Sequence, residues 1–120
     1  MSPSEVDLTE PTLTTDDLLV LEDPHFGPET TAVVTGAASG IGQATAVALA
    51  ANGLTIVGAD IDEDGLEETT ELAESLDVPG KIHSVPTDLT DDADVEAMID
   101  AAAEEGELRY VANIAGMQHI

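Results

Sequence analysis

From residue 31 onward, the hydrophobic pattern of the chain switches between two periods. Short apolar runs rich in Val, Ile and Ala alternate with longer stretches in which apolar residues recur every three or four positions. The short runs predict buried β-strands, and the longer stretches predict amphipathic helices. The expected strands are Thr31–Thr35, Leu54–Ala59, Lys81–Val85 and Arg109–Ala112, and the expected helices are Gly40–Ala51, Glu63–Leu76 and Asp91–Glu105.

The helical spacing also predicts which residues face the core. These are Ile41, Ala44, Ala48 and Ala51 in the first helix, Leu66, Thr70, Ala73 and Leu76 in the second, and Val95, Met98, Ile99 and Ala102 in the third. Asn52-Gly53 ends the first helix, and Thr90 is the expected N-cap of the third.

Strands that alternate with helices of this length predict parallel βαβ units. Right-handed crossovers give the strand order 3-2-1-4, so we expect an α/β fold, the first half of a Rossmann-like doubly wound parallel sheet. Residues 1–30 are predicted to be an acidic, mostly irregular extension with room for one helical turn at Thr15–Leu21. Residues 31–120 form the predicted domain.

The charge balance of the chain is extreme. It holds 26 Asp and Glu residues against only Lys81 and Arg109, which gives a net charge of −24. Such self-repulsion is tolerable in concentrated salt, because the Debye length falls to about 3 Å at 1 M. The composition is similar to that of halophilic archaeal enzymes. With so few cations, we expect neither nucleic acid nor an anionic membrane surface as a partner.

The sequence contains no Cys, which excludes disulfides, thiolate nucleophiles and Cys-ligated zinc. Its first thirty residues contain no Lys or Arg and no long apolar run, so no signal peptide is predicted. No stretch is long enough to span a bilayer. We therefore expect a cytoplasmic protein.

A glycine-rich loop joins the first strand to the first helix. Gly36 allows a sharp turn out of the strand, Gly40 lets a phosphate approach the backbone N–H groups, and Gly42 lets the helix pack closely. The amino end of the helix offers unpaired N–H groups and a positive dipole to an anion. The loop predicts a pyrophosphate site, although a plain Gly-rich turn is the alternative.

The second strand ends at Asp60, eighteen positions after Gly42. A carboxylate there can accept hydrogen bonds from the hydroxyl groups of the adenine ribose of a dinucleotide. No Lys or Arg precedes Lys81, so the predicted cofactor is NAD and not NADP. In so acidic a protein, an ordinary surface aspartate is the alternative for Asp60.

A second interpretation concerns the acidic run from Asp60 to Glu71. It fits the pattern D-x-D-x-D-G-x5-E of an EF-hand calcium loop. An EF-hand needs a helix before its loop, whereas Leu54–Ala59 is predicted to be a strand. The calcium-binding hypothesis is therefore the weaker one, and no metal site is predicted.

Three motifs together resemble the short-chain dehydrogenase/reductase family. The loop Thr35–Gly42 is similar to its T-G-x-x-x-G-I-G cofactor loop, Asp88-Leu89 to its adenine-binding pair, and Asn113–Gly116 to its N-N-A-G signature. Ile114 replaces the second Asn of that signature. The alternative role for Asp88 is in the helix-capping loop before the third helix. The resemblance implies an NAD site formed by Gly36, Ser39, Gly40, Ile41, Gly42, Asp60, Ile61, Asp88, Leu89, Asn113, Ala115 and Gly116.

The segment Gly116–Ile120 is similar to the corresponding segment of the 3-hydroxybutyrate dehydrogenases of that family. The resemblance implies an NAD-dependent oxidoreductase that interconverts a hydroxyl and a carbonyl group on a small substrate, with 3-hydroxybutyrate and acetoacetate as the named pair. It also implies that Gln118 helps to hold the carboxylate of the substrate. A homo-oligomer is implied for the full-length enzyme.

The family's catalytic Ser and its Tyr-x-x-x-Lys pair would lie beyond Ile120. We therefore expect the dinucleotide-binding domain, residues 31–120, to be truncated before the catalytic segment, and this fragment to be inactive alone. No catalytic residue is assigned. The alternative function is a nucleotide-binding module without catalysis.

Overall fold

The computed structural model describes residues 26–114, which form a four-stranded sheet and three helices. All seven expected elements are present, and the strand order β3-β2-β1-β4 confirms the Rossmann-like half sheet. The helical turn predicted at Thr15–Leu21 lies outside the described residues. Along the chain the elements are β1 (Thr30–Thr35), α1 (Gly40–Ala51), β2 (Thr55–Asp60), α2 (Glu63–Ser75), β3 (Lys81–Pro86), α3 (Asp92–Glu105) and β4 (Glu107–Asn113).

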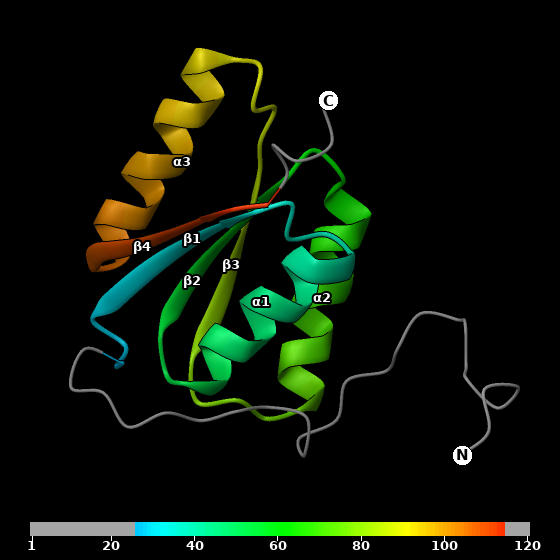
Figure 1. Ribbon diagram of the computed structural model, residues 1–120, viewed down its shortest axis with the longest axis vertical. Coiled ribbons are helices and arrows are strands. Elements are labelled where there is room, and N and C mark those ends of the chain that lie inside the picture. The colour runs from blue at the N-terminus through cyan, green and yellow to red at the C-terminus, as the bar shows by residue number, and fades with distance from the viewer. Residues whose placement is uncertain (1–25, 115–120) are drawn as a thin grey trace, which may run out of the picture.

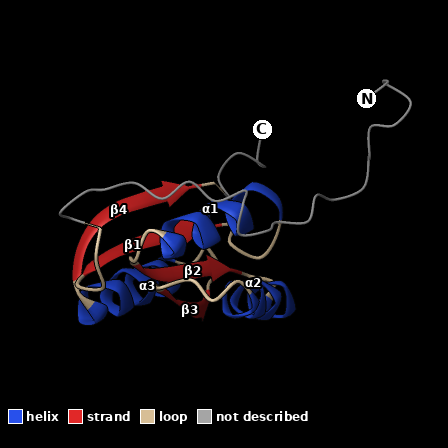
Figure 2. Cartoon of the chain, turned by 90° about the horizontal axis from the view of Figure 1, so that it is seen from below, coloured by secondary structure: helices blue, strands red, loops and turns tan. Residues whose placement is uncertain are grey.

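The two central strands, β1 and β2, are buried except for Asp60 at the end of β2. Each has a parallel neighbour on both sides, so that Val33 of β1 lies level with Val57 of β2 and Val111 of β4. Strands enclosed in this way need apolar side chains on both faces, which explains their unbroken apolar runs. The strands point the same way, and their carboxyl ends meet at one edge of the sheet (Figure 2).

Helices cover both faces of the sheet (Figure 1). α1 and α2 pack on one face around Leu54, Ile56 and Leu66. α3 packs Met98 and Ala102 against the other face, as predicted. No helix within residues 26–114 is long and apolar enough to cross a membrane.

The buried faces of α1 and α2 agree only in part with the predicted ones: Ala51, Leu66 and Ala73 are buried as predicted. Ile41 is 72% exposed, whereas Ala46 and Ala50 of α1 are fully buried. Because nearly every residue of α1 is small or apolar, its periodicity does not single out one face. In α2 the fully buried threonine is Thr69, and the expected Thr70 is partly exposed.

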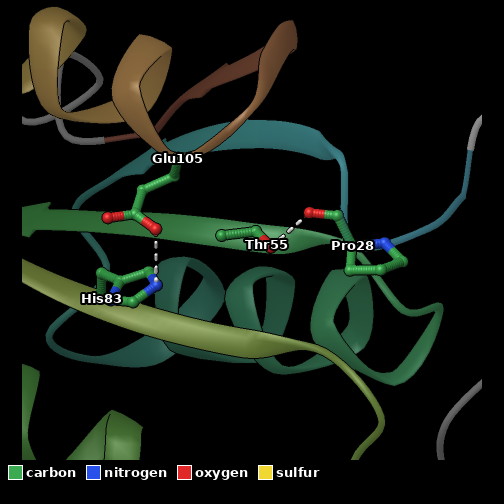
Figure 3. Close-up of polar contacts among 4 residues, drawn as sticks. All are labelled: Pro28, Thr55, His83 and Glu105. Carbon is green, nitrogen blue, oxygen red and sulfur yellow. Dashed lines mark hydrogen bonds and ion pairs between the residues drawn. The ribbon is translucent and has the colours of Figure 1, made fainter.

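Residues 26–29 join the domain at the amino ends of the strands. The Thr55 hydroxyl at the start of β2 donates a hydrogen bond of 2.8 Å to the carbonyl oxygen of Pro28 (Figure 3). The N–H of Glu107 donates a bond of the same length to the carbonyl of Glu29. This bond starts β4 two residues before Arg109, the expected first residue.

Ion pairs compensate little of the negative charge. Within residues 26–114 two are formed, one between His83 of β3 and Glu105 of α3 at 3.3 Å (Figure 3), the other between Arg109 and Glu107 at 3.1 Å. The remaining carboxylates of this region therefore face solvent or accept hydrogen bonds from neutral groups.

Candidate cofactor site

The four strands end together, at the edge where open α/β sheets bind ligands. Their last residues are Thr35, Asp60, Pro86 and Asn113. β2 and β3 lie on one side of β1 and β4 lies on the other, so the order in which successive strands are added reverses between β1 and β4. The predicted cofactor residues of the described region all lie on this edge or in the loops that leave it.

Each glycine of the loop after β1 meets a geometric demand. Gly36 has a φ of 69° and Gly40 a φ of 57°, both in the region that disfavours side chains. A Cβ on Gly42 would collide with the carbonyl oxygen of Gly36, so only glycine allows α1 to begin this close to the end of β1. A Cβ on Gly40 would meet no atom of residues 26–114 within 4 Å, so these residues leave the space beside Gly40 open to a ligand.

The N-cap and first turn of α1 contain no acidic residue. Ser39 occupies the N-cap without a side-chain hydrogen bond. The other two helices are capped by Asp62 and Asp91, and each has two acids in its first turn. The predicted N-cap of α3, Thr90, is therefore wrong. Of the described helices, only α1 leaves its amino end available to an anion.

One peptide group of the glycine loop is held at both ends. The carbonyl oxygen of Ala37 accepts a 2.6 Å hydrogen bond from the Thr69 hydroxyl, and the N–H of Ala38 donates a 3.2 Å bond to Oδ2 of Asp60. Both alanines are buried. Thr69 has no role predicted from the sequence, because its contact joins residues 32 apart in the chain and depends on how α2 packs.

The carboxylate of Asp60 lies at the end of β2, as predicted. Its Oδ1 accepts a 3.0 Å bond from the N–H of Asp62, while Oδ2 is bonded to Ala38. Each carboxylate oxygen has a second lone pair, so Asp60 retains the capacity to accept bonds from ribose hydroxyls. The neighbouring Ile61 is 73% exposed.

Asp88 and Leu89 lie in the turn between β3 and α3. Oδ1 of Asp88 accepts bonds from the Thr90 hydroxyl at 2.6 Å and from the Thr90 N–H at 2.9 Å. These bonds, the hydroxyl first, hold the pKa of Asp88 below its ordinary value. The Asp88 side chain thus orders this turn, and Leu89 is 37% exposed.

Thr35 connects the ends of β1 and β4. Its hydroxyl donates a 2.9 Å bond to Oδ1 of Asn113 and accepts a 3.0 Å bond from the N–H of Ile114. Because the Ile114 bond uses the backbone, the exchange of Asn for Ile in the signature does not remove it. Thr35 had no predicted role beyond its place in the motif. Three further predicted residues lie outside the described region: Ala115, Gly116 and Gln118.

The family model described as short chain dehydrogenase matches residues 30–120, which include all four strands and every predicted site residue. The chain belongs to the short-chain dehydrogenase family. Its membership confirms the family inferred from the three motifs. The closeness to 3-hydroxybutyrate dehydrogenases stays a prediction.

Relatives of this short-chain dehydrogenase sequence include two curated enzymes. It is 44% identical over 96 residues to 1-deoxy-11-beta-hydroxypentalenate dehydrogenase of Streptomyces avermitilis, a match that covers 78% of this chain and 34% of the relative. It is also 44% identical over 91 residues to cis-4-hydroxycyclohexanecarboxylate dehydrogenase of Sinomonas cyclohexanicum, with 74% and 35% covered. The chain spans about a third of the length of these relatives.

A solved structure agrees with this family and fold. A short-chain dehydrogenase/reductase from Burkholderia phymatum, in complex with NAD, superposes with a TM-score of 0.59 at 37% sequence identity. The match covers 68% of this chain and 28% of that one.

The acidic run Asp60–Glu71 does not form an EF-hand. Strand β2 precedes it, Asp62 caps α2 by accepting a 3.0 Å bond from the Gly65 N–H, and Glu71 lies within α2. An EF-hand would need a helix where β2 lies. In the part of the chain that the structure describes, no three His, Asp or Glu side chains are grouped as metal ligands.

Proposed function

We propose that this chain supplies the NAD-binding part of an oxidoreductase that interconverts a hydroxyl and a carbonyl group on a small substrate. When bound, NAD supplies the hydride acceptor for this reaction. Family membership and the NAD complex of the Burkholderia relative support the proposal. The single observation that carries the choice of NAD is Asp60, whose carboxylate closes the second strand and is bonded into the glycine loop.

In this proposal the pyrophosphate lies against the loop and the uncapped amino end of α1, where Ser39, Gly40 and Ile41 are exposed. Asp60 accepts bonds from the adenine ribose. The remaining proposed contacts to the cofactor come from Ile61, Asp88, Leu89, Asn113, Ala115 and Gly116.

Electrostatics favours NAD over NADP at this position. The 2′-phosphate of NADP would lie beside Asp60, and like charges about 4 Å apart repel by about 4 kcal/mol at an effective dielectric constant of 20, before screening by salt. Arg and Lys could offset this repulsion. Lys81 begins β3 and Arg109 lies near the start of β4, so both stand toward the opposite edge of the sheet.

The test is the ratio of NAD to NADP affinity, measured by calorimetry in concentrated salt on the full-length protein. We expect NAD to bind at least about tenfold more tightly, because a repulsion of only 1.4 kcal/mol suffices for that ratio. Asp60→Asn should narrow the ratio, and so should Asp60→Ala. Both variants also loosen the bond to Ala38, so the affinity for each cofactor falls and the ratio is the informative quantity.

Asp64→Asn is the matched control, because it removes the same charge from an exposed position in the first turn of α2. It should leave the ratio nearly unchanged. Equal or tighter binding of NADP by the wild type would overturn the assignment of Asp60. NAD binding without turnover of any alcohol or ketone would instead indicate a nucleotide-binding module.

We also propose 3-hydroxybutyrate as the substrate, with Gln118 holding its carboxylate. The support is the resemblance of Gly116–Ile120 to that group of dehydrogenases. NAD reduction by the full-length protein with 3-hydroxybutyrate, and a raised KM in Gln118→Leu, would agree with the proposal. Equal rates with 3-hydroxybutyrate and with butan-2-ol, which lacks the carboxylate, would contradict it.

A further inference from the structure

We propose that Thr69 of α2 is a positioning residue for the cofactor loop, since it holds the Ala37 carbonyl and so fixes the Ala37–Ala38 peptide that leads to the pyrophosphate site. The inference rests on the proposed function, because it concerns the same phosphate site. Thr69 is fully buried and lies in a helix outside every cofactor motif of the sequence.

The hydrogen bonds around Thr69 have a definite direction. Its hydroxyl has one hydrogen and two acceptors within reach, the carbonyl oxygens of Ala37 at 2.6 Å and of Gly65 at 3.1 Å. The shorter contact favours donation to Ala37. The Thr69 oxygen in turn accepts a 3.0 Å bond from Nε2 of Gln43 in α1. A chain of bonds therefore runs from Gln43 through Thr69 to the loop, and each bond polarises the next.

The orientation of this peptide fixes the path of the loop toward the amino end of α1. A flip about the Ala37–Ala38 peptide would exchange its C=O and N–H directions, turn the carbonyl oxygen toward the Asp60 carboxylate and break both hydrogen bonds that hold this part of the loop. Thr69 stabilises the carbonyl in its inward direction, and Asp60 binds the N–H on the other side. With both ends held, the N–H groups that follow in the loop and at the start of α1 stay available to the anion.

Close packing of α2 makes this contact possible. A Cβ on Gly65, one turn before Thr69, would lie 2.7 Å from Cβ of Ala38 and 2.8 Å from its carbonyl oxygen. Glycine at this position thus allows α2 to approach the loop closely enough for the Thr69 hydroxyl to reach Ala37.

The experiment compares ligands with and without a pyrophosphate on the full-length protein. Affinities for NAD, ADP-ribose and adenosine are measured for the wild type, Thr69→Val, Thr69→Ser and Thr70→Val. Valine keeps the shape of threonine and removes its hydroxyl, whereas serine keeps the hydroxyl. Thr70 is the matched control, because it lies in the same helix and bonds to Leu66 and Ser84, not to the loop.

Thr69→Val should weaken NAD and ADP-ribose binding by about three- to tenfold, the usual effect of one lost hydrogen bond. Adenosine binding should change less than about twofold, because adenosine makes no contact with the loop. Thr69→Ser should restore most of the affinity, and Thr70→Val should resemble the wild type. A merely structural defect would weaken adenosine and NAD alike.

Unchanged NAD binding by a folded Thr69→Val protein would overturn the inference, as would equal losses for adenosine and NAD. If Thr69→Val does not fold, Gln43→Met at a partly exposed position removes the donor to Thr69 and should weaken the pyrophosphate ligands selectively. Equal affinities in Gln43→Met and the wild type would also count against it. A wild type that binds neither NAD nor ADP-ribose would refute the proposed function itself.

Discussion

Replacing Thr31 with Val should stabilise the folded protein. Thr31 lies in the central strand β1 with no exposed surface, and its hydroxyl oxygen makes no hydrogen bond to any described residue. A buried polar group without a partner costs about 1–3 kcal/mol. Valine has nearly the same shape, so the exchange removes this cost without opening a cavity. We expect the free energy of unfolding to rise by about 1–3 kcal/mol.

Thr55→Val in the neighbouring strand is the matched control. Thr55 is also buried, but its hydroxyl donates to the carbonyl of Pro28 at 2.8 Å (Figure 3). The same chemical change there should lower the free energy of unfolding by about 0.5–1.5 kcal/mol. The two variants should thus shift stability in opposite directions.

The assay is denaturant unfolding of the full-length protein and both variants in one salt concentration, with the midpoints compared at equal slope. Because the two exchanges are identical, changes in the unfolded chain largely cancel. A loss of stability in Thr31→Val as large as that in Thr55→Val would show that the Thr31 hydroxyl has a partner in the folded protein. That result would refute the reasoning.

Three further predictions concern the loop, the turn before α3 and the charge. Gly42→Ala should lower stability by about 1–3 kcal/mol or more and weaken NAD binding, because its Cβ would collide with the Gly36 carbonyl; wild-type melting and affinity would contradict this. Thr90→Val should raise the pKa of Asp88 in a carboxyl NMR titration. Since the pKa of Asp88 is depressed in the folded protein, the stability linked to it is present above the unfolded pKa and is lost as pH falls through the folded pKa. If the wild type and Thr90→Val still differed in free energy of unfolding in strong acid, ionisation of Asp88 would not be the cause. Finally, melting temperature should rise with salt because the net charge is −24, and identical melting at about 0.1 M and 1 M salt would argue against the halophilic interpretation.

The sequence pattern located α1 to the residue, from Gly40 to Ala51, because strong local signals mark both of its ends. A glycine turn precedes it and Asn52-Gly53 follows it. The start of β4 was two residues too late, because Glu107 joins the strand by bonding to Glu29, a contact from the other end of the chain. Local propensity contains no information on such a partner.

The candidate site also combines residues that local sequence predicts with residues whose roles depend on distant contacts. Glycine spacing and strand ends were enough to place Asp60 and the loop, since both follow from the order of elements. The role of Thr69 could not be predicted from the sequence of α2, because it depends on the close approach of Gly65, one turn earlier, to the loop. Gly65 has no side chain, so a hydrophobic pattern does not mark it as a packing position. Asp91 replaced Thr90 as the cap because Thr90 already bonds to Asp88.

The pairing of β1 with β4 sets a waiting time during synthesis. Thr35 and Asn113, which meet at the carboxyl edge, are 78 residues apart in the chain. A ribosome that adds about 5–20 residues per second needs about 4–16 s to cover that distance. Once β2 has been made, β1, whose six residues are all buried in the finished domain, has β2 on one edge and an open hydrogen-bonding edge on the other until β4 emerges. The nascent chain is therefore most prone to mispairing with other strands in the seconds before β4 emerges.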